Sequence, residues 1–135
     1  MSRQKDYLVT FDRVDLTFQG GSHLFHDLSL AIPEGSFHFL TGASGVGKST
    51  LLKLIYLDAK PTDGQVRVFG KDIQRITPHQ AAVVRRKVGN VFQDFRLIAH
   101  LTALENVALP LKVDGIDGKR REKEAKELLD WFGLS

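Results

Sequence analysis

The fold expected for this chain depends on a single stretch, Gly42-Ala43-Ser44-Gly45-Val46-Gly47-Lys48-Ser49. It matches G-x-x-x-x-G-K-[ST], the pattern of a glycine-rich loop that lies between a strand and a helix and binds phosphate. Residues 36–41 before it are apolar enough to predict a short strand buried on both faces. Residues 48–56 after it carry leucine and isoleucine at helical spacing. The order strand, glycine-rich turn, helix therefore predicts an α/β fold.

The residue types of this loop suit a nucleoside triphosphate. Glycines let the backbone curve so that its N–H groups point inward, a conformation that Cβ atoms obstruct. Those N–H groups, with the positive end of the following helix, would bind the β-phosphate, and the Lys48 ammonium would reach the β and γ oxygens. The Ser49 hydroxyl would coordinate Mg²⁺, which prefers oxygen ligands. A chance match in an ordinary glycine-rich turn is the alternative, and the flanking strand and helix disfavour it.

The other elements follow from alternation, turn residues and caps. Thr77 and Thr102 each begin a capping box, and the second of these helices is expected to stop near Pro110. The remaining elements are expected as a hairpin over 9–32, strands over 65–69 and 88–92, and helices over 77–87, 102–110 and 118–132. His38, on the expected buried strand, is interpreted as a hydrogen-bonded core residue rather than a metal ligand, because no second ligand accompanies it at a suitable spacing.

Composition excludes several classes of protein. The 135 residues are 42% hydrophobic and 26% charged, which is typical of a globular domain rather than a disordered tail or a fibre. Without cysteine there is no disulfide framework and no thiolate metal site. No run approaches the roughly 18 apolar residues of a membrane span, and the first residues do not resemble an export signal. The net charge of +3 is too small to indicate nucleic acid or anionic lipid as a partner.

Four segments together resemble the ABC-type ATPase family of P-loop proteins. Residues 40–52 resemble its Walker A region, 61–66 its Pro-Thr-Ser-Gly turn, 91–97 its Q-loop and 101–111 the start of its helical subdomain. Within the family, residues 35–42 and 92–97 are most similar to the FtsE group of cell-division ATPases. The resemblance implies a P-loop NTPase core with an N-terminal antiparallel β-subdomain and the start of an α-helical subdomain.

The resemblance also assigns roles to individual residues. Phe18 stands where the family places an aromatic ring that stacks on adenine, although a plain core residue of the hairpin would also be apolar here. Gln93 falls on the Q-loop glutamine, whose amide oxygen approaches Mg²⁺ in the family. The expected nucleotide contacts are therefore Phe18, Gly42, Ala43, Ser44, Gly45, Val46, Gly47, Lys48, Ser49, Thr50 and Gln93, and the expected metal ligands are Ser49 and Gln93.

Other parts of the family pattern are absent from these 135 residues. The sequence contains no Leu-Ser-Gly-Gly-Gln signature, no apolar strand ending in Asp-Glu and no switch histidine. Asp130 is followed by Trp131 in a helical context, so it is not a Walker B aspartate. We therefore expect a truncated nucleotide-binding domain that is inactive alone, with no catalytic residue, divided into a β-subdomain and P-loop core over about 1–94 and the start of the helical subdomain over about 95–135.

By resemblance, the whole protein would be the ATP-binding subunit of an FtsEX-type complex. It would bind and hydrolyse ATP with Mg²⁺ as a head-to-tail homodimer, at the cytoplasmic face of the bacterial inner membrane, coupled to the integral membrane partner FtsX. One alternative is the ATPase of an ABC exporter or lipoprotein-release system, and another is a non-catalytic nucleotide-binding protein. Nucleic acid is not expected, because the basic clusters 85–87 and 119–121 fit solvated helix faces.

Overall fold

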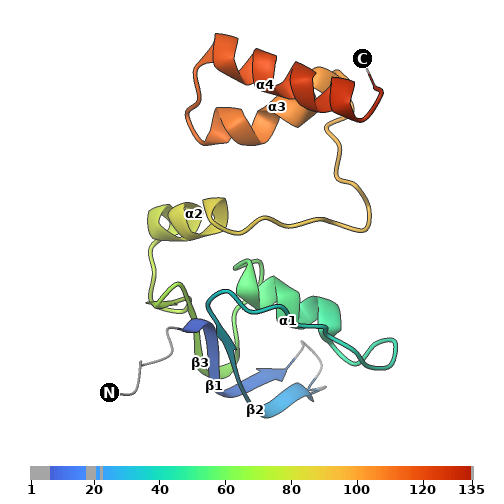
Figure 1. Ribbon diagram of the computed structural model, residues 1–135. Coiled ribbons are helices and arrows are strands. Elements are labelled where there is room, and N and C mark those ends of the chain that lie inside the picture. The colour runs from blue at the N-terminus through green and yellow to red at the C-terminus, as the bar shows by residue number, and fades with distance from the viewer. Residues whose placement is uncertain (1–6, 18–20, 22, 135) are drawn as a thin grey trace. The chain divides into compact units, whose positions relative to one another are not determined.

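The computed structural model describes residues 7–17, 21 and 23–134. The chain divides into two compact units, residues 1–88 and residues 89–135, each with its own internal contacts. Figure 1 shows both units and labels helices α1 to α4 and strands β1 to β3. The first unit contains the sheet and the glycine-rich loop, and the second contains a pair of helices.

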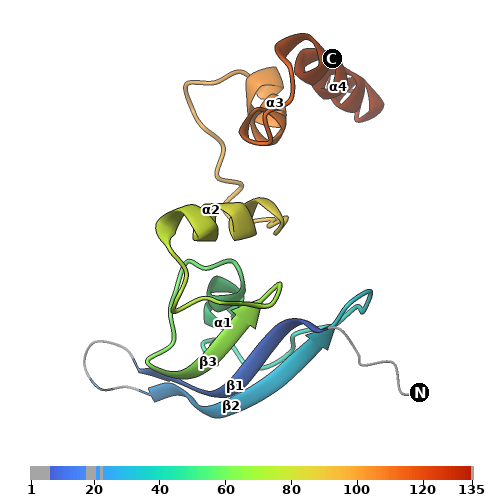
Figure 2. The ribbon, with the colours of Figure 1, turned by 90° about the vertical axis from the view of Figure 1, so that its left-hand side faces the viewer.

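The first unit is built on a four-stranded antiparallel sheet with the order β2-β1-β3-β4. Figure 2 shows β2, β1 and β3 side by side. The strands are β1 (Tyr7–Thr17), β2 (His23–Pro33), β3 (Asp63–Val68) and β4 (Lys71–Asp72). In β1, Val9 and Phe11 pair with apolar residues of both neighbouring strands, because alternate residues of a strand share one face. The predicted hairpin and the antiparallel β-subdomain are confirmed.

One face of this sheet forms the core with α1 (Lys48–Ile55). Leu51 and Leu54 of the helix are buried, as are Val66 and Val68 of β3. The buried cluster consists of Val9, Phe11, Val14, Leu51, Leu54, Leu57, Val66, Val68, Ile73 and Val84. Figure 2 shows α1 beside β3, and this packing fixes the helix that follows the glycine-rich loop.

A second helix of this unit, α2 (Pro78–Arg86), begins as the sequence predicts. The Thr77 hydroxyl accepts the N–H of Gln80 at 3.3 Å, and the Gln80 side chain accepts the N–H of Thr77 at 2.9 Å. This reciprocal pair is a capping box, which satisfies two backbone donors at the helix start. Val84 lies in the core cluster, so α2 is attached to the same buried cluster as α1.

The two helices of the second unit are α3 (Ala103–Val113) and α4 (Gly118–Trp131), and they contact each other. The Asn106 side chain joins α3 to the loop before it, because its Oδ1 accepts the N–H of Ile98 at 2.8 Å and its Nδ2 donates to the carbonyls of Ile98, Leu101 and Thr102. The capping box at Thr102 is also confirmed.

The helix capped by Thr102 is expected from its sequence to end near Pro110. This prediction is wrong, because Pro110 lies inside α3. A proline removes one backbone donor, but the helix continues for one more turn. It ends at Val113, with Asp114 as the C-cap. Gly115 follows with a φ of +78°, and the N–H groups of Gly115 and Ile116 donate to the carbonyls of Lys112 and Leu111 at 3.1 and 2.9 Å. This is the Schellman arrangement, and a glycine in the left-handed region allows it at little cost.

The two strands expected over 36–41 and 88–92 are absent from the structure. Phe37 and Phe39 are 82% and 83% exposed, Val91 is 98% exposed, and within the described residues no strand runs beside either segment. His38 is also exposed, with Nε2 2.8 Å from the Ser36 hydroxyl, so its interpretation as a core residue is wrong. An apolar run shows that a segment can be buried, but a strand forms only where a neighbour supplies hydrogen bonds.

Gly64 of β3 lies directly against the backbone of β1. Its φ is +77°, and a Cβ at this position would lie 2.1 Å from the carbonyl oxygen of Arg13. Gly70 also has a positive φ, +72°, but no heavy atom lies within 4 Å of its Cβ position. Substitution of Gly70 would therefore add backbone strain alone, whereas substitution of Gly64 would add both strain and a steric clash with the neighbouring strand.

We expect Gly64→Ala to lower the free energy of unfolding by about 3 kcal/mol, because it adds a clash with backbone to the strain of a positive φ. The matched control Gly70→Ala should cost only about 1 kcal/mol, since it adds strain alone. Urea denaturation of both variants measures the difference. Equal losses would show that the β1–β3 approach is looser than the structure has it.

Candidate functional site

The glycine-rich loop joins the exposed segment 36–41 to α1. Gly42, Gly45 and Gly47 have φ values of +149°, +79° and +103°, a region that residues with a side chain rarely adopt. Gly47 is the N-cap of α1, and no side chain caps this helix. By contrast, the other three described helices are capped by Thr77, Thr102 and Asp117. The start of α1 therefore has backbone donors that suit an external acceptor such as phosphate.

The Lys48 side chain folds back over the loop. Its Nζ donates to the carbonyl oxygens of Gly42 at 2.9 Å and Ala43 at 2.7 Å. An ammonium group has three donors, so these two bonds leave one N–H for an anion above the loop. The arrangement places a positive charge beside the uncapped start of α1, where the helix dipole is also positive.

The strand β2 forms one wall of the loop. A Cβ on Gly47 would lie 2.9 Å from Cε1 of Phe25 and 3.1 Å from Cγ of Leu24. Only glycine allows this close contact between the hairpin and the loop. Sequence reasoning missed Leu24 and Phe25 as neighbours of the loop, because strand alternation gives no information about contacts between segments this far apart.

Comparison with known proteins identifies the family. A profile described as ABC transporter matches residues 25–135, which is most of the chain. The chain belongs to the ABC transporter family. It is similar to a dimeric structure of the ATP-binding cassette MJ0796 bound to ADP and Pi, with 38% sequence identity and a TM-score of 0.81. The match covers 90% of this chain and 56% of that one. The expected fold class, an ABC core with its antiparallel β-subdomain, is therefore confirmed.

Two curated relatives differ in what their names describe. The chain is 39% identical over 127 residues to the cell division ATP-binding protein FtsE of Bacillus subtilis, covering 94% of this chain and 56% of the relative. It is 42% identical over 131 residues to the methionine import ATP-binding protein MetN of Vibrio cholerae, covering 95% of this chain and 38% of the relative. The chain thus spans little more than half the length of FtsE and less than half that of MetN.

The structure brings together one part of the expected nucleotide site. Residues 42–50 form a continuous loop and helix start, with Lys48 and Thr50 half-buried and Ser49 exposed. Phe18 lies outside the described residues, so its contact with adenine stays a prediction. Gln93 is exposed and belongs to the second unit, so its approach to Ser49 and Mg²⁺ also stays a prediction.

The backbone around Gln93 forms a tight local turn. Phe95 and Arg96 have φ values of +56° and +48°, and the Arg96 guanidinium lies 3.8 Å from the centre of the Phe92 ring. Arg96 also pairs with Asp94 at 3.4 Å. A cation over an aromatic face and a nearby carboxylate both stabilise the guanidinium, so the turn is held by its own side chains. Sequence reasoning did not assign Arg96 this role.

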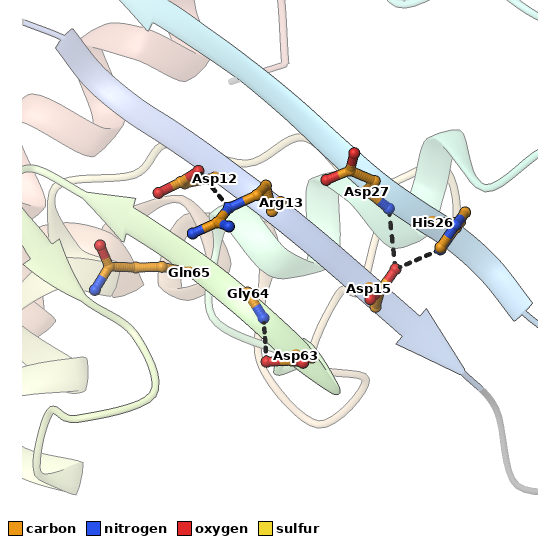
Figure 3. A pocket seen from close by; sticks show the side chains of 8 residues that line it. All are labelled: Asp12, Arg13, Asp15, His26, Asp27, Asp63, Gly64 and Gln65. Atoms are coloured by element: carbon orange, nitrogen blue, oxygen red, sulfur yellow. Dashed lines mark hydrogen bonds and ion pairs between the residues drawn. The ribbon is translucent and has the colours of Figure 1, made fainter.

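A polar hollow of about 540 Å³ lies over the sheet (Figure 3), and no residue of the glycine-rich loop lines it. It is lined by Asp12, Arg13, Asp15, His26, Asp27, Asp63, Gly64 and Gln65. Asp15 Oδ1 accepts the N–H of Asp27 at 2.9 Å and lies 3.1 Å from Nδ1 of His26. In the described part of the chain, no group of three or more His, Cys, Asp or Glu side chains is arranged to hold a metal ion.

Two hydrogen bonds hold the pKa of Asp15 below its ordinary value. The bond donated by the Asp27 backbone N–H has the larger effect, and the bond with the His26 side chain has the next largest. A carboxylate with a lowered pKa in the folded state stabilises the fold above its unfolded pKa, and this contribution disappears as the pH falls through the folded pKa. We therefore expect the protein to lose stability below about pH 4 in part through Asp15.

Asp15→Asn should make the urea midpoint less sensitive to pH between 7 and 3, because asparagine does not titrate. The matched control is Asp12→Asn, since Asp12 lines the same hollow and its carboxylate pairs with Arg13 at 3.6 Å. This variant keeps both hydrogen bonds to Asp15, so its urea midpoint should keep the pH sensitivity that those bonds provide. If both variants keep the full sensitivity, the bonds to Asp15 do not contribute to it.

Proposed function

We propose that this chain supplies the ATP-binding part of an ABC ATPase. The observation that carries the proposal is the loop over residues 42–49, in which three glycines of positive φ, an uncapped helix start and the Lys48 ammonium surround one position. Each of these groups favours negative charge, and together they suit the β and γ phosphates of a nucleotide. Family membership and the likeness to a cassette bound to ADP and Pi support the same reading.

Different residues of the chain would bind different parts of the nucleotide. Backbone N–H groups of the loop and of the start of α1 would bind the β-phosphate, and Lys48 would exchange its two carbonyl bonds for phosphate oxygens. Phe18 would present its ring to adenine. The hydroxyl of Ser49 and the amide oxygen of Gln93 are oxygen donors of the kind that Mg²⁺ takes. Bound Mg²⁺ would neutralise charge on the phosphates.

We assign ATP hydrolysis to the whole protein and no catalytic residue to this chain. Within the family, ATP hydrolysis requires residues that orient the attacking water, and the sequence here contains none of the motifs that supply them. The whole protein would act as a head-to-tail dimer, peripheral to the cytoplasmic face of the inner membrane. The described residues include no helix that is both long and apolar enough to span a membrane. A membrane partner is part of the proposal.

Cell division is the first role that we propose, with FtsX as the membrane partner. It is supported by the similarity of residues 35–42 and 92–97 to the FtsE group and by the likeness to FtsE of Bacillus subtilis. Transport is the second candidate, supported by the 42% identity to MetN of Vibrio cholerae. Co-expression of the full-length protein with FtsX or with a permease separates them, because a true partner should stimulate ATP hydrolysis and the other should not.

Lys48→Ala should weaken ATP binding on the order of 100-fold, since it removes two charge-assisted hydrogen bonds of about 1.5 kcal/mol each. The matched control is Lys53→Ala, because Lys53 is an exposed lysine of the same helix. Its affinity should remain unchanged. Equilibrium titration with ATP in the presence of Mg²⁺ measures both variants, and an unaltered affinity in Lys48→Ala would contradict the proposed site.

A further inference from the structure

The C-terminal end of α1 has an unusual residue at a position that normally favours glycine. Leu57 has a φ of +63°, and its N–H donates to the carbonyl of Leu54 at 3.3 Å. The next N–H, that of Asp58, donates to the carbonyl of Lys53 at 2.8 Å. This is a Schellman ending with leucine in place of glycine, which costs about 1 kcal/mol or more in backbone strain. The Leu57 side chain lies in the buried core, which offsets that cost.

Arg85 of α2 holds this strained residue. Its guanidinium Nη2 donates to the Leu57 carbonyl at 2.6 Å, across 28 residues of sequence. The carbonyl lies at the negative end of the α1 dipole, so a cation is favourable there. The neighbouring residue Val84 is buried in the same cluster as Leu51 and Leu54. Arg85 and Val84 thus attach the last turn of α2 to the end of α1.

The same helix α1 carries the proposed phosphate site at its other end. It has eight residues, so its two ends are only about 12 Å apart. Because it is short and packed through Leu51 and Leu54, α1 moves as a rigid body. A ligand that orders its N-terminal end therefore also orders the Leu57 carbonyl. The chain leaves α2 directly after the Arg85 turn and continues to Gln93.

We propose that Arg85 is a positioning residue for nucleotide binding, an inference that rests on the proposed function. It joins the phosphate-binding helix α1 to the last turn of α2, so that nucleotide at residues 42–50 restrains the start of the segment that carries Gln93. In this proposal Arg85 itself does not contact the nucleotide. It acts through the Leu57 carbonyl, and the restraint passes through a hydrogen bond whose two partners belong to the same compact unit.

Amide hydrogen exchange of the full-length protein, with and without ATP and Mg²⁺, tests this proposal. In the unsubstituted protein, ATP should slow exchange about tenfold both in α1 and in residues 84–88. In Arg85→Ala the slowing in α1 should persist, whereas that in residues 84–88 should fall to less than about threefold. A purely structural role would speed exchange equally with and without ATP, so the change on adding ATP is the informative quantity.

The matched control is Arg86→Ala. Arg86 is exposed on the same helix turn and its guanidinium makes no hydrogen bond among those described, so the ATP response should be unaltered. If Arg85→Ala does not fold, Arg85→Lys replaces it in the test, since lysine keeps the charge but reaches less far toward the Leu57 carbonyl. In Arg85→Lys, the slowing by ATP in residues 84–88 should be smaller than in the unsubstituted protein but larger than the value expected for Arg85→Ala.

Two outcomes overturn the inference separately from the proposed function. The first outcome is that, in the unsubstituted protein, ATP slows exchange in α1 but not in residues 84–88. The second is that residues 84–88 respond equally to ATP in Arg85→Ala and Arg86→Ala. Either outcome contradicts the role of Arg85 and leaves the nucleotide site intact. Absence of any slowing in α1 contradicts the nucleotide site itself, and the inference about Arg85 fails with it.

Discussion

Burial of one face of α1 against the sheet is the constraint on which the rest of the first unit depends. A helix of eight residues is not stable alone in water, because nucleation costs more than so few hydrogen bonds return. Leu51 and Leu54 supply the missing free energy by packing with Val66 and Val68 of β3. Without this contact, neither the uncapped helix start nor the Leu57 ending would hold its position.

Several features that cost backbone free energy lie where α1 begins and ends. At its start, three glycines of positive φ and an N-cap without a side-chain partner leave backbone donors directed at an external acceptor. At its end, Leu57 in the left-handed region is held by the Arg85 guanidinium and by burial. A folded chain retains such features where neighbouring contacts compensate for them, and functional sites are where they commonly occur. The helix therefore connects the proposed phosphate site to α2.

The apolar segment before the loop shows how composition and structure can differ. Phe37 and Phe39 contact each other edge to face, with ring centres 5.0 Å apart, yet both remain largely exposed. Their alternation with polar residues suits a strand, but backbone hydrogen bonds to a neighbour decide whether a strand forms. The apolar character of the segment therefore did not lead to its burial in this structure.

The sequence alone determined the elements whose causes are local. The capping boxes at Thr77 and Thr102, the β1–β2 hairpin and the glycine-rich loop depend on residues close together in the chain, so spacing and residue type predict them. Only the tertiary structure decided that residues 36–41 are not a strand, that Phe25 lies against Gly47, and that Arg85 bonds to Leu57. Each of these depends on whether segments distant in sequence meet, and a pattern along the chain contains no information about that meeting.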